Sequence, residues 1–319
     1  MLTRCGATAL LIITVNVAGC QNARRAPVIL DTDIGGDIDD TWALALALAS
    51  PELDLKLVVS DSHNARGKAR IAAKFLERAG RTDVPVGIGL TIDDEIGPQA
   101  PWVADYDLAR YPGTVHEDGV GALIDTIMRS PQPITLITIG PVPNIAEALR
   151  REPRIADRAR LIAMAGSVEK QYGDKPGRCP ETNVVTDASA AQATYQAPWD
   201  VTMAPLDTAG IVYLRGNTYA QVRDSGNPIA RAVMENYRIW AKGIGGIDPE
   251  KQSSCLFDTV AVYLAFSNDL CGVRNLSIKV TDRGVTEPDP AGKLMHVAMT
   301  WKNLDAFHEF VARRIAQAR

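Results

Sequence analysis

The chain has 319 residues, of which 46% are hydrophobic and 23% charged, with 34 basic and 38 acidic side chains. The net charge of −4 argues against a nucleic-acid partner, since such proteins normally carry a basic surface. Five cysteines are too few for a disulfide scaffold in a chain of this length. An oxidising compartment would permit a disulfide between Cys255 and Cys271, and two free buried thiols are the equal alternative.

The first 20 residues, MLTRCGATALLIITVNVAGC, have the features of an export signal. Arg4 and the α-amino group form a short positive region. The mostly apolar run that follows is shorter than the roughly 20 residues that a membrane-spanning helix needs. Residues 17–20, VAGC, resemble a bacterial lipobox, in which the cysteine becomes lipidated and forms the new N-terminus. An ordinary cleaved signal peptide is the alternative.

This leader predicts both processing and location. We expect a signal peptide over residues 1–19, a short tether over 20–26 and one domain over 27–319. Lipidation of Cys20 would attach the protein to a membrane of the bacterial cell envelope, on the periplasmic side or at the cell surface. Several acyl chains are needed for a stable anchor, because a single chain binds membranes only marginally.

Beyond the leader, short apolar runs alternate with segments of helical periodicity. We expect strands at 27–30, 55–59, 84–88, 134–139, 159–163 and 201–204. We expect helices at 41–49, 66–79, 121–128, 143–149, 188–196, 227–241, 255–266 and 304–316. Strands separated by helices predict an α/β fold in one domain, with a mainly parallel open sheet and helices on both faces. Such sheets bind ligands at the carboxyl ends of their strands.

The loop after the first expected strand is strongly acidic. Residues 31–40, DTDIGGDIDD, contain five carboxylates within ten positions. Capping of the following helix explains one or two of them. The repulsion among the others would be costly unless a cation offsets it. Ca²⁺ takes oxygen ligands and tolerates irregular loop geometry, so the loop predicts a calcium site, with a solvated acidic turn as the alternative.

Two other metal motifs were compared with this loop. An EF-hand that starts at Asp31 would need an acidic ligand at its twelfth position, which is Trp42, so that motif is excluded. The D-x-D of haloacid-dehalogenase-type phosphatases matches Asp31 and Asp33, but the fifth position is Gly35 and three more aspartates follow. A Mg²⁺-dependent phosphatase of this type therefore stays as a less favoured alternative.

The acidic loop resembles the D-x-D-x-G…D-D signature of the inosine-uridine-preferring nucleoside hydrolase family. Further similarities to that family follow in the same order, at 134–148 (ITLITIGPVPNIAEA), 164–167 (MAGS), 181–183 (ETN), 205–207 (PLD) and 257–258 (FD). The resemblance covers most of the chain after the leader. It implies a nucleoside hydrolase-like fold and a calcium-dependent hydrolase that cleaves the N-glycosidic bond of ribonucleosides to free base and ribose.

The resemblance also implies roles for residues of the calcium site. Asp33, Asp40 and Asp258 would bind calcium through their carboxylates, and Ile139 through its main-chain carbonyl. Asp39 would be the base that takes a proton from the attacking water. Asp37 is the alternative base, because this loop is two residues longer than the shorter form found in the family.

On the substrate side, the resemblance implies that Glu181 and Asn183 bind the ribose and that Met164 packs beneath it. Phe257 stands where many members have a histidine that assists departure of the base, and a phenylalanine cannot transfer a proton. His63, at the end of the second expected strand, is the best substitute acid. The nucleobase preference stays open, and a homodimer or homotetramer is what the family resemblance suggests.

Because Phe257 cannot transfer a proton, the sequence is also compatible with a protein that binds ribosides without catalysis. A lipoprotein that binds nucleosides or related ribosides without turning them over would keep the same calcium and ribose ligands. Such a binding protein is the main alternative to the enzyme.

Overall fold

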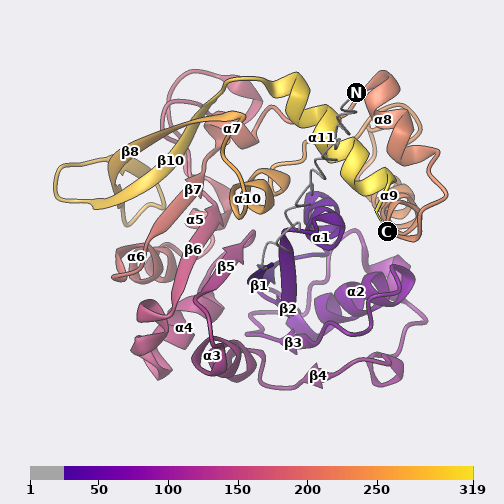
Figure 1. The fold of residues 1–319 in the computed structure, drawn as a ribbon, viewed down its shortest axis with the longest axis horizontal. Coiled ribbons are helices and arrows are strands. Elements are labelled where there is room, and N and C mark those ends of the chain that lie inside the picture. The colour runs from indigo at the N-terminus through magenta and orange to yellow at the C-terminus, as the bar shows by residue number, and fades with distance from the viewer. Residues whose placement is uncertain (1–24, 319) are drawn as a thin grey trace, which may run out of the picture.

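The computed structural model describes residues 25–318, so the leader and Cys20 lie outside the described residues. Within the described part, one sheet has the strand order β4-β3-β2-β1-β5-β6-β7-β10-β8-β9 (Figure 1). Its strands are β1 (Ala26–Thr32), β2 (Leu53–Ser60), β3 (Val86–Ile88), β4 (Val115–His116), β5 (Ile134–Thr138), β6 (Ala159–Met164), β7 (Val201–Ala204), β8 (Cys271–Val280), β9 (Thr286–Pro288) and β10 (Lys293–Trp301).

The central strands are parallel and buried on both faces. β1 pairs with β2 on one side and with β5 on the other, so that Val28 lies between Leu55 and Thr135. From Pro27 to Thr32 every residue of β1 is buried, as expected for a parallel strand that is covered by helices on both sides. The first expected strand is thus present, and it begins at Ala26, within the predicted tether.

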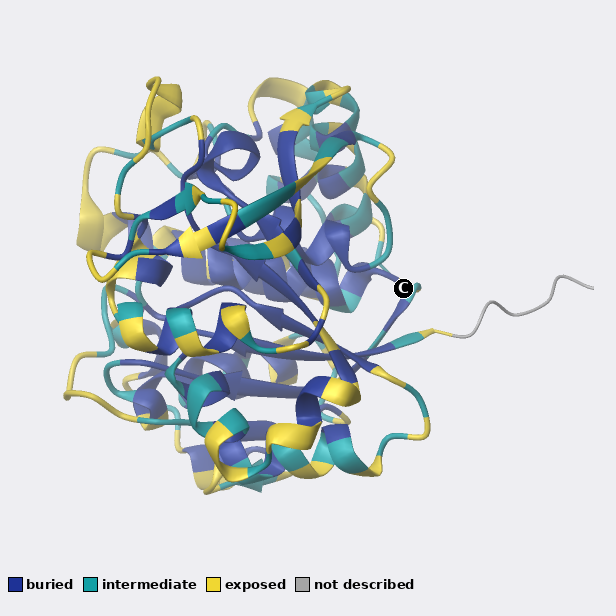
Figure 2. Ribbon diagram, turned by 90° about the vertical axis from the view of Figure 1, so that its left-hand side faces the viewer, coloured by how far each residue is buried: buried dark blue, intermediate teal, exposed yellow. Residues whose placement is uncertain are grey.

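Helices cover both faces of the sheet, and two separate hydrophobic clusters mark the two layers. One face carries α1 (Asp39–Ala49), α2 (Ala65–Arg78), α7 (Leu206–Ala209), α8 (Gly216–Arg223), α9 (Pro228–Ile244), α10 (Thr259–Leu264) and α11 (Leu304–Ala316). The other carries α3 (Gly119–Arg129), α4 (Pro143–Arg151), α5 (Thr182–Val185) and α6 (Ala188–Gln196). Exposed residues lie mainly on the outer faces of these helices and on the loops (Figure 2). The predicted single-domain α/β fold with a mainly parallel sheet is confirmed.

The C-terminal third differs from the sequence expectation. The helix expected over 255–266 is only the short α10, and 271–301 contains three strands that were not expected. β8 pairs antiparallel with β10 and with β9, and β8 and β10 extend away from the central strands as a ribbon (Figure 1). Most of β8 is half-buried or exposed, so it lacks the continuous apolar run that reveals a buried strand.

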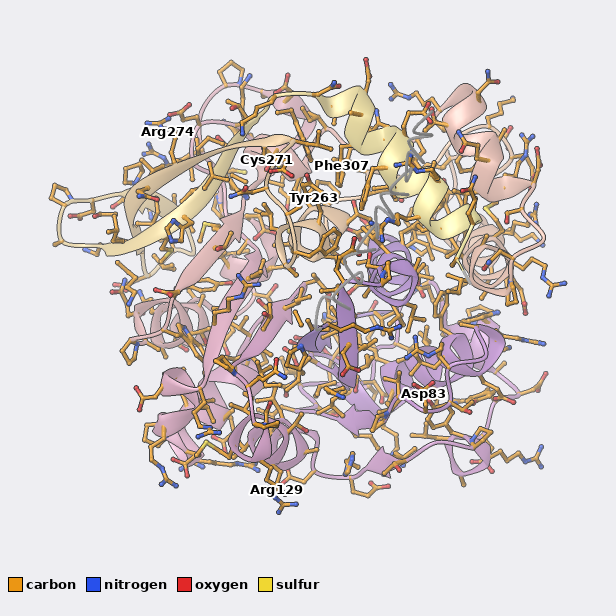
Figure 3. The ribbon with its side chains drawn as sticks, in the orientation of Figure 1. Asp83, Arg129, Tyr263, Cys271, Arg274 and Phe307 are labelled. Atoms are coloured by element: carbon orange, nitrogen blue, oxygen red, sulfur yellow. The ribbon has the colours of Figure 1, made fainter. Side chains whose placement is uncertain are left out.

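Aromatic side chains pack between α10 and the C-terminal helix α11. The rings of Tyr263 and Phe307 lie 5.2 Å apart between the two helices, while Arg274 projects from β8 (Figure 3). Cys255 and Cys271 are free thiols, so the open disulfide question is answered in favour of the reduced form in this structure. In the described part of the chain, none of the helices combines the length and apolar character needed to cross a membrane.

Candidate active site

A pocket of about 300 Å³ lies where the strands β1, β5 and β6 end. Its wall includes every site residue predicted from the sequence, drawn from six separate segments of the chain. These residues are Asp33, Asp37, Asp39, Asp40, His63, Ile139, Met164, Glu181, Asn183 and Asp258. The carboxyl edge of a parallel sheet brings them together because each predicted segment ends there.

The acidic loop between β1 and α1 is held by residues 96–99 and by Trp240 of α9. Gly35 has a φ of +121°, and a Cβ at this position would lie 2.5 Å from the carbonyl oxygen of Ile96, so only glycine fits. The indole of Trp240 donates a hydrogen bond to the carbonyl of Gly36 at 2.9 Å. The amide of Gln99 donates to the carbonyl of Asp37 at 2.6 Å. These contacts fix the loop that carries most of the carboxylates.

Three carboxylates form a compact cluster at the start of α1 and α10. Oxygen atoms of Asp39, Asp40 and Asp258 lie within 4.8 Å of one another, and their residues are only 4%, 2% and 2% exposed. The backbone N–H of Asp258 donates to Asp39 Oδ2 at 3.3 Å. Burial, followed by repulsion among the carboxylates, raises the pKa of all three well above the ordinary value. An all-oxygen, negatively charged donor set of this kind fits a hard divalent cation.

The other predicted ligands lie beside this cluster. Asp33 is outside the three-carboxylate set, and its side chain is 23% exposed. The carbonyl of Ile139, just after β5, accepts a hydrogen bond from Asn183 Nδ2 at 3.3 Å, and a second lone pair remains for a cation. Asp37 is exposed at the rim, where its Oδ1 accepts from the backbone N–H of Ile38 at 2.6 Å.

Glu181 and Asn183 line the pocket at the start of α5. Glu181 Oε2 accepts from the N–H of Gly166 at 2.9 Å, and Oε1 accepts from the N–H of Asn183 at 2.9 Å. Burial nevertheless raises the pKa of Glu181 to about 7. Asn183 Nδ2 also donates to the carbonyl of Met164 at 3.0 Å. With its amide nitrogen committed to main-chain carbonyls, Asn183 has its amide oxygen available for a ligand hydroxyl.

His63 reaches the same pocket from the turn between β2 and α2. Ser62 and His63 both have positive φ values, +57° and +44°, which is uncommon for residues other than glycine. The Nδ1 atom of His63 lies 2.8 Å from Asp93 Oδ2, so the ring is oriented by a carboxylate. Backbone strain of this kind persists where the surrounding structure enforces it, and it is often found at functional sites.

Two further residues of the pocket were not expected from the sequence. Lys68 on α2 is 1% exposed and lies 3.8 Å from Asp33 Oδ2. The ring of Tyr172 packs edge-on against Phe257, with centroids 6.0 Å apart, and its hydroxyl contacts Glu181. The burial of Lys68 could have been predicted from the sequence, because its position falls between Ala65 and Ala72 on the apolar face of the helix. Tyr172 lies in a loop and has no comparable signal.

The phosphatase alternative needs an accessible Asp31, and the structure does not provide one. Asp31 is completely buried and accepts a hydrogen bond from Asn144 at 2.8 Å. Among the described residues that line the pocket, Asp33 is present and Asp31 is not. A nucleophile at Asp31 would therefore have no route to a substrate.

Comparisons with known proteins agree with this geometry. Residues 28–309 match the family model described as inosine-uridine preferring nucleoside hydrolase. A pyrimidine-specific ribonucleoside hydrolase, RihA, of Salmonella paratyphi B is 31% identical over 224 residues, which are 66% of this chain and 69% of that protein.

Solved structures show the same fold. A plant nucleoside hydrolase, PpNRh1, superposes with a TM-score of 0.77 at 21% identity, over 92% of this chain and 99% of that one. A purine-preferring ribonucleoside hydrolase from Gardnerella vaginalis gives a TM-score of 0.75 at 24% identity, over 92% and 98%. With the match over 28–309 and the pocket at the carboxyl edge of the sheet, the chain belongs to the inosine-uridine preferring nucleoside hydrolase family and is an N-ribosyl hydrolase.

Proposed function

We propose that this protein is a calcium-dependent hydrolase that cleaves the N-glycosidic bond of ribonucleosides to free base and ribose. The observation that carries the proposal is the buried cluster of Asp39, Asp40 and Asp258 in a pocket that Glu181 and Asn183 also line. The carboxylate cluster is suited to a divalent cation, and Glu181 and Asn183 are suited to sugar hydroxyls.

The cluster and the carbonyl of Ile139 are the groups that would hold the cation, and Asp33 lies beside them. When bound, Ca²⁺ supplies orientation of the sugar hydroxyls and of the attacking water, and it lowers the pKa of that water. The carboxylates themselves stabilise the positive charge that develops on the sugar as the glycosidic bond breaks.

The geometry changes which carboxylate we propose as the base. Asp39 lies inside the buried cluster and already accepts a hydrogen bond from the Asp258 amide, so we propose it as a ligand. Asp37 is at the rim. Asp33 lies outside the cluster, is partly exposed to the pocket and is the carboxylate that can take a proton from water there. Comparing Asp33→Asn, Asp37→Asn and Asp39→Asn separates these roles, because loss of the base lowers kcat without lowering calcium affinity in proportion.

The remaining residues act on the sugar and on the leaving base. Asn183 and Glu181 hold the hydroxyls, and Met164 packs against the ring of the sugar. As the bond between C1′ and the base nitrogen breaks, the electron pair leaves with the base, and His63, oriented by Asp93, donates a proton to it. Water adds to C1′ and gives its proton to Asp33, which balances the reaction.

The test is a product profile from the mature protein in the presence of Ca²⁺. Purine, pyrimidine and nicotinamide ribosides should be offered, with uridine and cytidine included because the Salmonella relatives are named as pyrimidine-specific. We expect equal amounts of free base and ribose, and loss of activity with a chelator. Binding of ribosides with no product would favour the binding lipoprotein, and turnover of a simple phosphomonoester would revive the phosphatase.

We also propose export and attachment to the bacterial cell envelope through a lipidated Cys20, on the strength of the leader sequence alone. Metabolic labelling with a fatty acid should mark the wild type and not Cys20→Ser, and equal labelling would refute the anchor. Self-association as a homodimer or homotetramer is tested on the mature chain by light scattering.

A further inference from the structure

Lys68 is a buried cation within a pocket of carboxylates. It lies on α2 and is 1% exposed, and its Nζ has no hydrogen-bond partner among the described residues. The nearest charged atom, Asp33 Oδ2, is 3.8 Å away, which is too far for a hydrogen bond. An ammonium carries three donors, and burying them without acceptors is costly. Among the described residues, the protein supplies no acceptor within hydrogen-bond distance of this ammonium.

The stem of Lys68 is held in one direction by its surroundings. A Cβ at Gly35 would lie 3.3 Å from Lys68 Cγ. Because Gly35 has no side chain, the methylene chain of Lys68 can pack against the acidic loop at this point. At the preceding position, Gly67 lies so close to Ile96 that a Cβ would come within 2.4 Å of it. The acidic loop and the 95–98 segment thus enclose the side chain, and its amine cannot extend into solvent as most lysines do.

We propose that Lys68 is a substrate-binding residue whose ammonium donates a hydrogen bond to a hydroxyl of the bound sugar. This inference rests on the proposed riboside hydrolase function. Lys68 Nζ and Asp33 Oδ2 are 3.8 Å apart. A hydroxyl oxygen can therefore lie about 2.8 Å from each of them, which is hydrogen-bond distance to both. The hydroxyl accepts from Lys68 and donates to Asp33 Oδ2, and Asp33 Oδ1 remains for the water.

A hydroxyl is the acceptor that the pocket favours over an anion. Seven carboxylates line the same pocket, namely Asp33, Asp37, Asp39, Asp40, Glu95, Glu181 and Asp258. Repulsion from these groups excludes a phosphate or carboxylate at the side of Lys68. A neutral hydroxyl, which can accept from the ammonium and donate to a carboxylate, satisfies both neighbours.

The experiment uses the calcium-loaded full protein and the variants Lys68→Met and Lys68→Gln. Lys68→Met keeps most of the stem volume and removes the donors and the charge, and Lys68→Gln keeps a neutral donor. We expect KM for the best riboside to rise about 10- to 100-fold in Lys68→Met, the usual effect of losing a hydrogen bond to a charged group. We expect Lys68→Gln to fall between it and the wild type. The matched control is Lys74→Met, on the same helix, where Nζ donates to the carbonyl of Trp102 outside the pocket.

Deoxyribosides identify the hydroxyl. The penalty of Lys68→Met should disappear with one of the 2′-, 3′- or 5′-deoxyribosides, because that compound lacks the acceptor. Calcium affinity, measured by titration calorimetry, gives a readout that does not depend on turnover. A lysine that only offsets the carboxylates would give tighter calcium binding on substitution with KM unchanged for every riboside, and that result would overturn the inference. If the wild type turns over no riboside at all, the proposed function itself fails, which is a different outcome.

Discussion

Two glutamates of this protein, Glu147 and Glu181, have pKa values shifted in opposite directions. Glu147, on the surface of α4, accepts hydrogen bonds from Arg150 and Arg151, and these guanidiniums lower its pKa to about 2. Glu181, in the pocket, has only N–H and hydroxyl donors around it, and burial raises its pKa to about 7. The same residue type is therefore stabilised as an anion in one region and destabilised as an anion in the other.

The difference extends from these residues to their regions. On α4, the single acid Glu147 has two basic partners on the same helix, Arg150 and Arg151. In the pocket, Asp39, Asp40 and Asp258 have mainly one another, and Lys68 is a single nearby cation. Ion pairs on a surface need nothing further, whereas a buried cluster of like charges is a site for a ligand that carries the opposite charge.

The largest effect should come from breaking the carboxylate cluster. Asp258→Asn keeps the shape and removes one charge, and we expect kcat to fall by about 100- to 1,000-fold, as when a preorganised electrostatic group is lost from an active site. Calcium affinity should fall as well, which calorimetry measures. The control is Asp269→Asn, an exposed aspartate in the loop after α10. Unchanged calcium affinity in Asp258→Asn would contradict the proposed ligand role.

A smaller effect should follow from Glu181→Gln on stability in a chelator. Because the folded pKa of about 7 exceeds the ordinary 4.5, the folded protein binds more protons than the unfolded chain between these values. The free energy of unfolding should therefore decrease as the pH rises from 4.5 to 7. At about 1.4 kcal/mol per pKa unit, Glu181 contributes up to about 3 kcal/mol of this decrease. Urea denaturation should show that part of the slope missing in Glu181→Gln, and equal slopes would show that Glu181 titrates normally.

The smallest effect should come from Glu147→Gln, and with the opposite sign. Its folded pKa of about 2 lies below 4.5, so its contribution is present above 4.5 and is lost as the pH falls toward 2. Exposed ion pairs contribute at most about 1 kcal/mol. The unfolding free energies of wild type and variant should differ slightly at pH 7 and converge in acid, with calcium affinity and kcat unchanged. A change in either of those would mean that α4 is coupled to the pocket.

The sequence was sufficient to predict those elements whose burial is visible in a local pattern of apolar and polar residues. The alternation of apolar runs with helical segments predicted a parallel sheet, and the acid-rich segment after β1 predicted a site at the carboxyl edge of that sheet. The same approach did not find β8, because most of its residues are half-buried or exposed and its place in the sheet depends on pairing with β10 and β9. Lys68 was missed for a related reason, since a lysine in a helix is usually solvated and only the neighbouring loop makes this one buried.

The sequence by itself determined the fold class, the family resemblance and ten of the residues that line the pocket, because these depend on residue type and order along the chain. The tertiary structure decided how close those residues lie to one another. Asp39 joined Asp258, 219 positions away, in one cluster, and Asp33 was left beside Lys68. Such distances depend on how α1, α2 and α10 pack on the same face of the sheet, and a linear pattern does not contain that information.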